Sequence, residues 1–512
     1  MSKILHDIEV PLNEELKDHL AWMVPNYADF RILRQSVDAR RKHQVHQVFS
    51  VEVAEAGETL PVYEETVEEL PKKNRQPVLI IGTGPAGLFA ALRLIERGIP
   101  CILFERGSVA EKRMMGINRY WRYGELDARN NVCFGEGGAG LYSDGKLITR
   151  IKSPYIPYVL HRLVKFGAPA EIQYLANPHV GSDRLRRVIP FLRQELLRRG
   201  AIIHFDTRVS ELLFDGQQIK GLRTEHGDEF LGQHVILATG HSAKDIFEQL
   251  REKGVALEGK SFAMGLRVEH PQSLINRIQY RQFAEHPKLG AANYKLTHHD
   301  HPTNTGVYSF CMCPDGYILS SGTEPNALVC NGMSNYRRNS AFANAAVVVT
   351  VDHDKIFGKD MWGGFRLRSD LERKAFDSVR LAGGTKQLPA QKMLDFMQGR
   401  ATKELGPFST PSGAVPVRLD QLLPSWMTEA LRQGLKGFQK NMREYVHESA
   451  QLFGVETRTS CPLRIPRHNE SLQSISHAGL YPCGEGAGYA GGITSAACDG
   501  IRVAEAIVQE LR

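Results

Sequence analysis

The sequence has few cysteines, no long apolar run and little net charge. Only 8 of its 512 residues are cysteine, and they are scattered, so we expect no disulfide framework and a reducing, cytoplasmic environment. No apolar run approaches the roughly 20 residues that span a bilayer, so we expect no membrane association. The net charge of +7 is small for this length and is only weak evidence for nucleic-acid binding. Residues 1–10 mix charged with apolar side chains, so we expect no signal peptide.

Residues 78–106 form a dinucleotide-binding pattern. An apolar run predicts a buried parallel strand, a helix begins within the glycine segment that follows, and a second apolar strand ends at an acid. Gly82 permits the tight turn, Gly84 lets a pyrophosphate approach the backbone, and Gly87 lets helix and strand pack closely. The helix N-terminus offers free N–H groups and partial positive charge to phosphates. Glu105 lies where an acid accepts hydrogen bonds from ribose hydroxyls, which suits FAD or NAD better than NADP. The predicted cofactor-binding residues here are Gly82, Gly84, Pro85, Ala86, Gly87, Glu105 and Arg106.

We find no second complete unit of strand, glycine turn, helix and acid. The glycines of residues 135–140 fit the pattern, but residues 130–134 make a poor strand and Ser143-Asp144-Gly145 interrupts any following helix. We interpret this segment as a loop whose N–H groups, around Gly137 and Gly138, form an anion nest at the cofactor. A separate nicotinamide domain is therefore not expected, and NADH or NADPH would act only as a transient reductant.

Two later segments indicate which dinucleotide is bound. Residues 233–240 predict an apolar strand ending in Ala-Thr-Gly, and glycines recur from Gly479 to Gly492 before a final helix. This arrangement resembles the flavoproteins of the glutathione-reductase-like superfamily, which have two dinucleotide-binding domains. The resemblance implies that the late segment contacts FAD and that the last helix points its N-terminus at the flavin ring. It adds to the predicted site Val209, Thr239, Gly240, Gly484, Glu485, Gly491, Gly492 and Ile493.

A closer resemblance covers most of the chain, from about residue 30 to residue 505. The motifs are Phe134–Leu147, Gly265–Pro271, Phe310–Pro314, Gly454–Ile465 and Gly484–Ile493. They resemble a family of uncharacterised FAD-dependent dehydrogenases found in bacteria and plastids. The resemblance implies the fold and FAD as cofactor, but it implies no particular substrate.

The expected fold class is α/β with a discontinuous main domain. We predict a small N-terminal α/β domain, for which a ferredoxin-like fold is one candidate, over residues 1–70, and an exposed linker over 71–77. A Rossmann-like FAD-binding domain follows over 78–254 and 456–512. Residues 255–455 form an inserted α+β substrate domain.

Four residues are candidates for catalysis. Cys311 and Cys313 are two apart, so a regular strand would put both on one face, where they could act as a dithiol or one as a nucleophile. The alternative to a chemical role is that both cysteines are small side chains buried in the strand. His270 could transfer a proton, or could be a structural residue before a proline. Lys146 could hold an anionic substrate or polarise the flavin, or could form a simple ion pair.

Two arginines and a histidine-rich segment complete the candidates. Arg458 and Arg464 precede the last glycine segment and could bind a substrate carboxylate. Residues 298–301 read His-His-Asp-His, but neighbouring residues on a strand diverge and rarely share one metal ion, so we expect no metal site.

The predicted function is an FAD-dependent oxidoreductase acting on a small anionic or conjugated organic substrate. Two alternatives stay open. One is a flavoprotein that acts on RNA, gripped by the basic turn Arg40-Arg41-Lys42. The other is a non-catalytic binding protein with a structural FAD, whose N-terminal domain would bind a protein partner.

Overall fold

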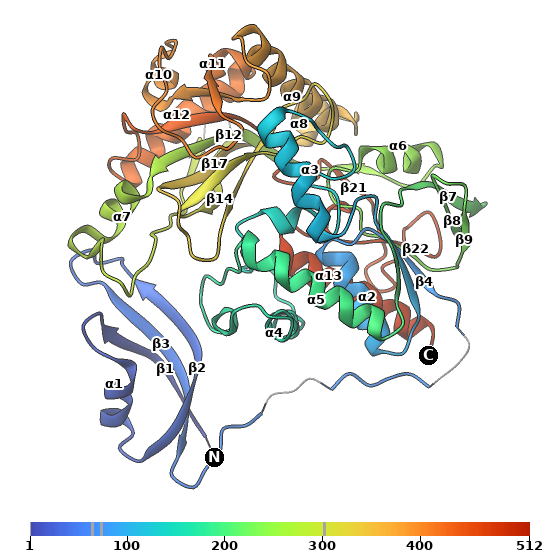
Figure 1. The fold of residues 1–512 in the computed structure, drawn as a ribbon, viewed down its shortest axis with the longest axis horizontal. Coiled ribbons are helices and arrows are strands. Elements are labelled where there is room, and N and C mark those ends of the chain that lie inside the picture. The colour runs from blue at the N-terminus through green and yellow to red at the C-terminus, as the bar shows by residue number, and fades with distance from the viewer. Residues whose placement is uncertain (1, 63–65, 72–74, 301–303) are drawn as a thin grey trace.

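Three main groups of strands organise the molecule. The computed structural model describes residues 2–62, 66–71, 75–300 and 304–512. It contains a three-stranded sheet near the N-terminus, a five-stranded sheet and a seven-stranded sheet, seen at the lower left, right and top of Figure 1. The predicted linker 71–77 lies partly outside the described residues, as does His301. No helix within the described ranges is long and apolar enough to cross a membrane.

The five-stranded sheet is parallel throughout. Its order is β22-β10-β4-β5-β6, where β4 is Val78–Ile81, β5 Cys101–Phe104, β6 Ile202–His204, β10 Val235–Leu237 and β22 Leu480–Pro482. Strands β4, β10 and β22 are buried along their whole length, which explains their unbroken apolar sequences. From β4 the chain builds the sheet in one direction through β5 and β6, and the later strands lie on the other side. The carboxyl ends of strands at such a reversal border a ligand crevice.

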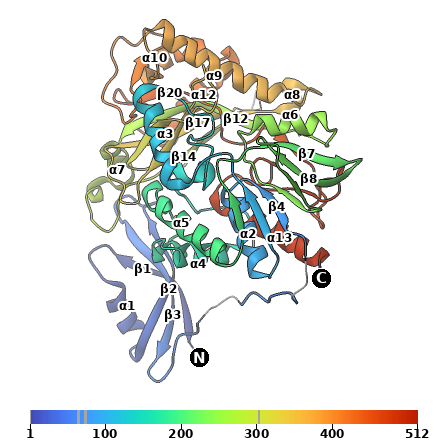
Figure 2. The same cartoon turned by 45° about the vertical axis from the view of Figure 1, so that its right-hand side comes forward.

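Helices cover the faces of this sheet. Helix α2 (Pro85–Glu96) begins at the glycine turn after β4 and packs against α13 (Ile493–Glu510) and α5 (Ser182–Arg198) (Figures 1 and 2). The remaining helices of this part are α3 (Ala110–Tyr123), η1 (Gly138–Tyr142), α4 (Ile156–Lys165), η2 (Ala170–Gln173) and α6 (Lys244–Glu252). A small antiparallel sheet joins β7 (Val209–Asp215), β8 (Gln218–Thr224) and β9 (Glu229–Leu231).

The strands of the seven-stranded sheet come between β10 and β22 in the chain. The chain therefore leaves the parallel sheet after β10, forms the seven-stranded sheet, and returns to pair β22 beside β10. Its order is β13 (Thr297–Asp300), β14 (Thr305–Cys313), β17 (Phe342–Val351), β12 (Phe262–Pro271), β20 (Gln451–Glu456), β18 (Leu388–Lys392) and β19 (Ala414–Pro416). Its helices are α7 (Gln272–Tyr280), η3 (Arg281–Phe283), α8 (His353–Phe357), α9 (Gly363–Leu381), α10 (Met393–Gln398), α11 (Leu419–Leu422) and α12 (Ser425–Asn441). Two short ribbons, β15 (Gly316–Ser320) with β16 (Cys330–Ser334) and β11 (Glu258–Gly259) with β21 (Leu463–Arg464), complete the strands.

The N-terminal unit has three antiparallel strands and one helix. These are β1 (Lys3–Pro11), α1 (Leu16–Met23), β2 (Tyr27–Asp38) and β3 (His46–Glu55), in the sheet order β1-β3-β2. This mixture of strands and a helix agrees with the α/β content expected for this segment, but a ferredoxin-like fold is not confirmed. The edge strand β2 binds the main body, because the Gln35 backbone exchanges 2.8 Å hydrogen bonds with Tyr174 and Ala176. Lys42 also donates a 2.6 Å hydrogen bond to the carbonyl of Ile278.

Candidate functional site

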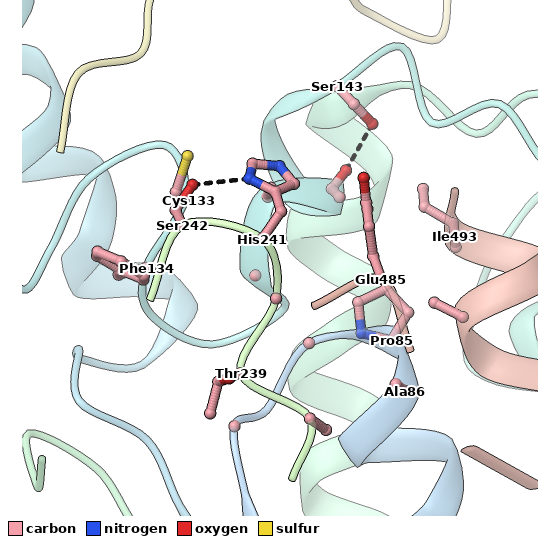
Figure 3. A pocket seen from close by; sticks show the side chains of 18 of the residues that line it. Pro85, Ala86, Cys133, Phe134, Ser143, Thr239, His241, Ser242, Glu485 and Ile493 are labelled. Atoms are coloured by element: carbon pink, nitrogen blue, oxygen red, sulfur yellow. Dashed lines mark hydrogen bonds between the residues drawn. The ribbon is translucent and has the colours of Figure 1, made fainter. Parts of the chain in front are cut away.

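One cavity of about 380 Å³ lies at the carboxyl ends of the parallel strands. Its walls come from the turn after β4, the glycine loop of residues 135–140, the start of α13, and β14 of the seven-stranded sheet. Figure 3 shows Cys133 and Phe134 on one side of it and Ile493 on the other, with Pro85 and Glu485 between them. The predicted site residues that line it are Gly82, Gly84, Pro85, Ala86, Glu105, Arg106, Gly138, Lys146, Val209, Thr239, Gly240, Cys311, Arg458, Glu485, Gly491, Gly492 and Ile493.

The three glycines after β4 have different neighbours. A side chain on Gly87 would overlap the carbonyl oxygen of Gly82, and one on Gly82, whose φ is +103°, would overlap the carbonyl of Ala238. Both glycines therefore serve the packing of the protein. A Cβ on Gly84 would meet no protein atom nearer than the Gly138 Cα, 3.9 Å away. The space beside Gly84 is therefore open to a ligand.

Glu105 joins the two glycine segments. Its Oε2 accepts hydrogen bonds from the backbone N–H and the hydroxyl of Thr83, at 3.0 and 2.8 Å. Its Oε1 accepts from the backbone N–H groups of Gly107 and Gly135, at 3.1 and 3.0 Å. The carboxylate lines the cavity, but these four donors give it a structural task that the sequence pattern did not indicate. Ribose binding by Glu105 stays a prediction.

Lys146 belongs to a charged group at the cavity wall. Its Nζ lies 3.7 Å from the Asp144 carboxylate, which is almost fully buried and also lies 3.8 Å from Arg338. Burial alone would lower the pKa of Lys146, but Asp144 outweighs it and the pKa is raised. Lys146 therefore carries a fixed positive charge at the cavity wall.

A β-bulge separates the two cysteines of β14. The pairing register with β17 shifts between Phe310 and Cys313, and Cys311 adopts a φ of +45°. Cys311 lines the cavity, whereas Cys313 is fully buried behind it. The prediction that both side chains face the flavin from a regular strand is therefore wrong, because a bulge breaks the alternation of faces.

Arg458 lines the cavity, but its guanidinium already binds Glu372. Its Nε and Nη2 donate to the two carboxylate oxygens of Glu372 at 3.0 and 2.7 Å, and Nη1 donates to Thr323 at 2.8 Å. Glu372 thus occupies the fork that would bind a substrate carboxylate, which corrects that prediction. Arg464 is not among the cavity-lining residues; its guanidinium lies over the ring of Tyr489 instead.

His270 is not part of the cavity. It is fully buried on β12, where its Nε2 lies 2.8 Å from the carbonyl of Tyr445. Burial lowers its pKa to about 4, so the ring is neutral near pH 7. The proton-transfer role considered for His270 is therefore replaced by a structural one. Gly87, Gly137, Gly484 and Cys313 likewise lie behind the residues that form the wall.

Other residues around the cavity escaped sequence reasoning. Arg113 is fully buried and donates hydrogen bonds to the carbonyls of Glu136, Gly138 and Asn131, so it holds the glycine loop in place. His241 lines the cavity, and burial lowers its pKa to about 3. No local motif marks either residue, because their partners are brought together only by the fold.

Two family models that match parts of the chain name FAD. Residues 261–459 match the family model "FAD-dependent protein, C-terminal domain-like", and residues 75–117 match an FAD binding domain. An uncharacterised protein of Clostridium beijerinckii is 41% identical over 495 residues, which cover 94% of this chain and 92% of that protein. The tetracenomycin B2 monooxygenase-dioxygenase of Streptomyces olivaceus is 30% identical over 178 residues, which cover 30% of each chain.

Solved structures show only a distant likeness. The flavin-dependent brominase Bmp2 is 13% identical, with 85% of this chain and 79% of that chain covered and a TM-score of 0.37. L-proline dehydrogenase from P. horikoshii is 12% identical, with 87% and 95% covered and a TM-score of 0.34. CtdE in complex with FAD is 12% identical, with 85% of each chain covered and a TM-score of 0.32. We draw no inference from likenesses this distant.

The residues of the cavity fit FAD. The open space at Gly84 adjoins the first turn of α2, whose free N–H groups suit a pyrophosphate. A second helix, α13, begins at the cavity behind Gly491, where a Cβ would meet no protein atom within 4 Å. Together with the 41% identity across nearly the whole chain, these observations identify the protein as a member of the FAD-dependent family of the Clostridium beijerinckii relative, with FAD as its cofactor.

Proposed function

We propose that the protein is an FAD-dependent oxidoreductase for a small anionic or conjugated organic substrate. Bound FAD supplies hydride or electron transfer. Gly84, Gly138 and the start of α2 would hold its pyrophosphate, and Gly491 and Gly492 at the start of α13 would lie at its reactive end. The single observation that carries the substrate class is Lys146, a charged amine that lines the cavity wall, is paired with Asp144 at 3.7 Å and keeps 29% of its side chain accessible.

Three properties of the chain support this reading. Lys146 and the N-terminus of α13 both line the cavity, and Thr494 in the first turn of α13 donates a 2.7 Å hydrogen bond to the carbonyl of Leu147, next to Lys146. Their positive charge favours an anion there. His241 is neutral near pH 7 because burial lowers its pKa to about 3, so its ring offers one N–H donor and one acceptor nitrogen. Glu485 also lines this cavity, and burial raises its pKa to about 7, which suits a group that exchanges protons near neutral pH.

Several finer predictions remain part of this proposal. They are the domain boundaries 78–254 with 456–512 and 255–455, membership of the glutathione-reductase-like superfamily, and kinship with plastid proteins. We also propose a cytoplasmic location, and NADH or NADPH as a reductant that visits the open flavin face. The N-terminal unit is proposed as a site for a protein partner.

An action on RNA is not favoured. Two of the three residues of the basic turn are engaged within the protein, since Arg40 pairs with Asp38 and Lys42 binds the carbonyl of Ile278. This turn therefore presents less free positive charge than its sequence suggests.

Anaerobic stopped-flow reduction of the FAD-loaded protein tests the proposal. After reduction by NADH, NADPH or dithionite, a panel of anionic and neutral acceptors is screened for reoxidation. Lys146→Met should raise the KM for anionic acceptors about 10- to 100-fold, because a charge-assisted hydrogen bond contributes about 1.5–3 kcal/mol. Neutral acceptors should be unaffected.

The matched control is Lys295→Met, which removes an exposed lysine that does not line the cavity. It should behave as the wild type. Equal KM values for anionic acceptors in wild type and Lys146→Met would overturn the assigned substrate class. Failure of every acceptor to reoxidise the flavin would support a structural role for FAD instead.

A further inference from the structure

The bulge in β14 gives two cysteines an unusual arrangement at the cavity. Cys311 has a φ of +45°, a conformation that non-glycine residues rarely adopt and that strains the backbone. Such strain persists only where the surrounding structure imposes it. Here Arg267, fully buried, donates a 3.4 Å hydrogen bond to the Cys311 carbonyl and fixes the bulge from behind.

The bulge places the thiol of Cys313 against the backbone of Cys311. The thiol of Cys313 donates a 3.3 Å hydrogen bond to the carbonyl oxygen of Cys311. In a regular strand, the Cα atoms of residues two apart are separated by nearly the longest distance that a disulfide tolerates. The bulge makes this segment irregular, so that limit does not apply to Cys311 and Cys313. One sulfur faces the cavity and the other lies directly behind it, which is the order that an attacking thiol and a resolving thiol require.

The charges around the pair favour a thiolate at Cys311. The hydrogen bond from Cys313, then the charges of Lys146 and Arg267, lower the pKa of Cys311 despite burial and despite Asp144. The pKa of Cys313 is raised by the same hydrogen bond and by burial.

The neighbouring carboxyl groups do not reverse this balance. Glu485 also faces Cys311, but burial holds its own pKa near 7. Asp144 is paired with Lys146 at 3.7 Å. Near neutral pH the cavity-facing sulfur therefore carries the negative charge and the buried one keeps its proton.

We propose that Cys311 and Cys313 form a redox-active dithiol that exchanges with a small disulfide admitted by the cavity. The Cys311 thiolate attacks one sulfur of that disulfide, the S–S bond breaks, and one thiolate leaves. Cys313 passes its proton to that first thiolate and attacks Cys311 Sγ. The bond between Cys311 and the small molecule breaks, and the second thiolate leaves and takes up from solvent the proton that Cys311 had released on ionising. Two protein thiols are oxidised to one disulfide, and the small disulfide is reduced to two thiols. The activity is independent of the substrate that FAD serves.

The dithiol differs from the other cysteines of the chain. Five other cysteines are buried: Cys101, Cys330, Cys461, Cys483 and Cys498. Of these five, Cys483 alone lines the cavity. Burial raises the pKa of each of these five. Cys133 also lines the cavity but has no cysteine beside it in sequence or fold, so it is the matched control.

The test uses the FAD-loaded protein and hydroxyethyl disulfide, a small neutral probe, under anaerobic conditions. After denaturation, free thiols are alkylated and the peptides are analysed by mass spectrometry. In the wild type and in Cys133→Ser, the peptide containing residues 311 and 313 should lose two hydrogens and escape alkylation. In Cys313→Ser, the reaction should stop at a mixed disulfide on residue 311.

Cys311→Gly, which suits the positive φ and so protects the fold, should give neither product. Iodoacetamide should alkylate Cys311 of the native protein with a pH midpoint at least about one unit below the 8.5 of an ordinary thiol. Lys146→Met should raise that midpoint. A mixed disulfide at Cys133 in place of Cys311, full alkylation of both cysteines after treatment, or a midpoint at or above that of an ordinary thiol would overturn the proposal.

Discussion

Gly84→Ala should weaken FAD binding without harming the fold. It precedes α2 with φ −72° and ψ −177°, a conformation open to any residue, and an added Cβ would lie 3.9 Å from its nearest protein atom. Gly84→Ala should therefore fold normally. The loss of glycine before a helix costs about 0.5–1 kcal/mol, and the reduced entropy of the unfolded chain returns about 0.4–1 kcal/mol.

FAD binding should respond very differently. The new methyl group would occupy the cavity wall beside Gly84, where a pyrophosphate approaches the backbone of the turn. Loss of one charge-assisted N–H contact, about 1.5–3 kcal/mol, weakens FAD binding about 10- to 100-fold. Flavin fluorescence titration of the apoprotein measures the Kd, and urea unfolding of the same sample measures its stability.

Gly87→Ala is the matched control, because a Cβ there would overlap the carbonyl oxygen of Gly82. It should destabilise the apoprotein by about 1–3 kcal/mol or more through strain. If Gly84→Ala bound FAD within about threefold of wild type while remaining folded, the pyrophosphate would not pass beside Gly84 and the reasoning would be refuted.

Three further predictions concern stability and docking. Arg458→Met leaves the Glu372 carboxylate buried without its partner at 2.7 Å; urea unfolding should show a loss of about 3–5 kcal/mol, and a loss below about 1 kcal/mol would contradict the pairing. Burial raises the pKa of Glu269 to about 7, so the stability that its protonated form contributes is complete below about pH 4.5 and is lost as the pH rises through 7. Between about pH 5 and 8, the free energy of unfolding of Glu269→Gln should therefore gain up to about 3 kcal/mol relative to wild type. A difference between the two proteins that does not change with pH would contradict this. Lys42→Met removes a hydrogen bond to the carbonyl of Ile278; amide exchange in β2 should accelerate about tenfold, and unchanged exchange would show that this contact does not hold the N-terminal unit.

The local parts of the site were predictable from sequence, and the long-range parts were not. Gly82, Gly84 and Gly87 sit on a turn whose strand and helix are encoded within 30 residues, so their placement follows from local pattern. Arg458 and His270 have partners 86 and 175 residues away. A charged or aromatic residue gives no local sign that such a partner will engage it.

The cysteines of β14 illustrate a different limit. Alternation of faces predicts that residues 311 and 313 point the same way, and this holds only while the strand is regular. The bulge depends on the register with β17 and on the buried Arg267, neither of which the segment itself encodes. Glu105 was placed correctly at the end of β5, but its hydrogen bonds to Thr83 and Gly135 depend on how the two glycine segments fold together.

A crystal structure of the FAD-loaded protein tests the central claim most directly. We expect the adenosine half beside Glu105 and Arg106, the pyrophosphate beside Gly84 and Gly138, and the isoalloxazine ring at the end of the cavity lined by Cys311 and Gly492. An isoalloxazine ring beside Glu105, or FAD bound outside this cavity, would contradict the account.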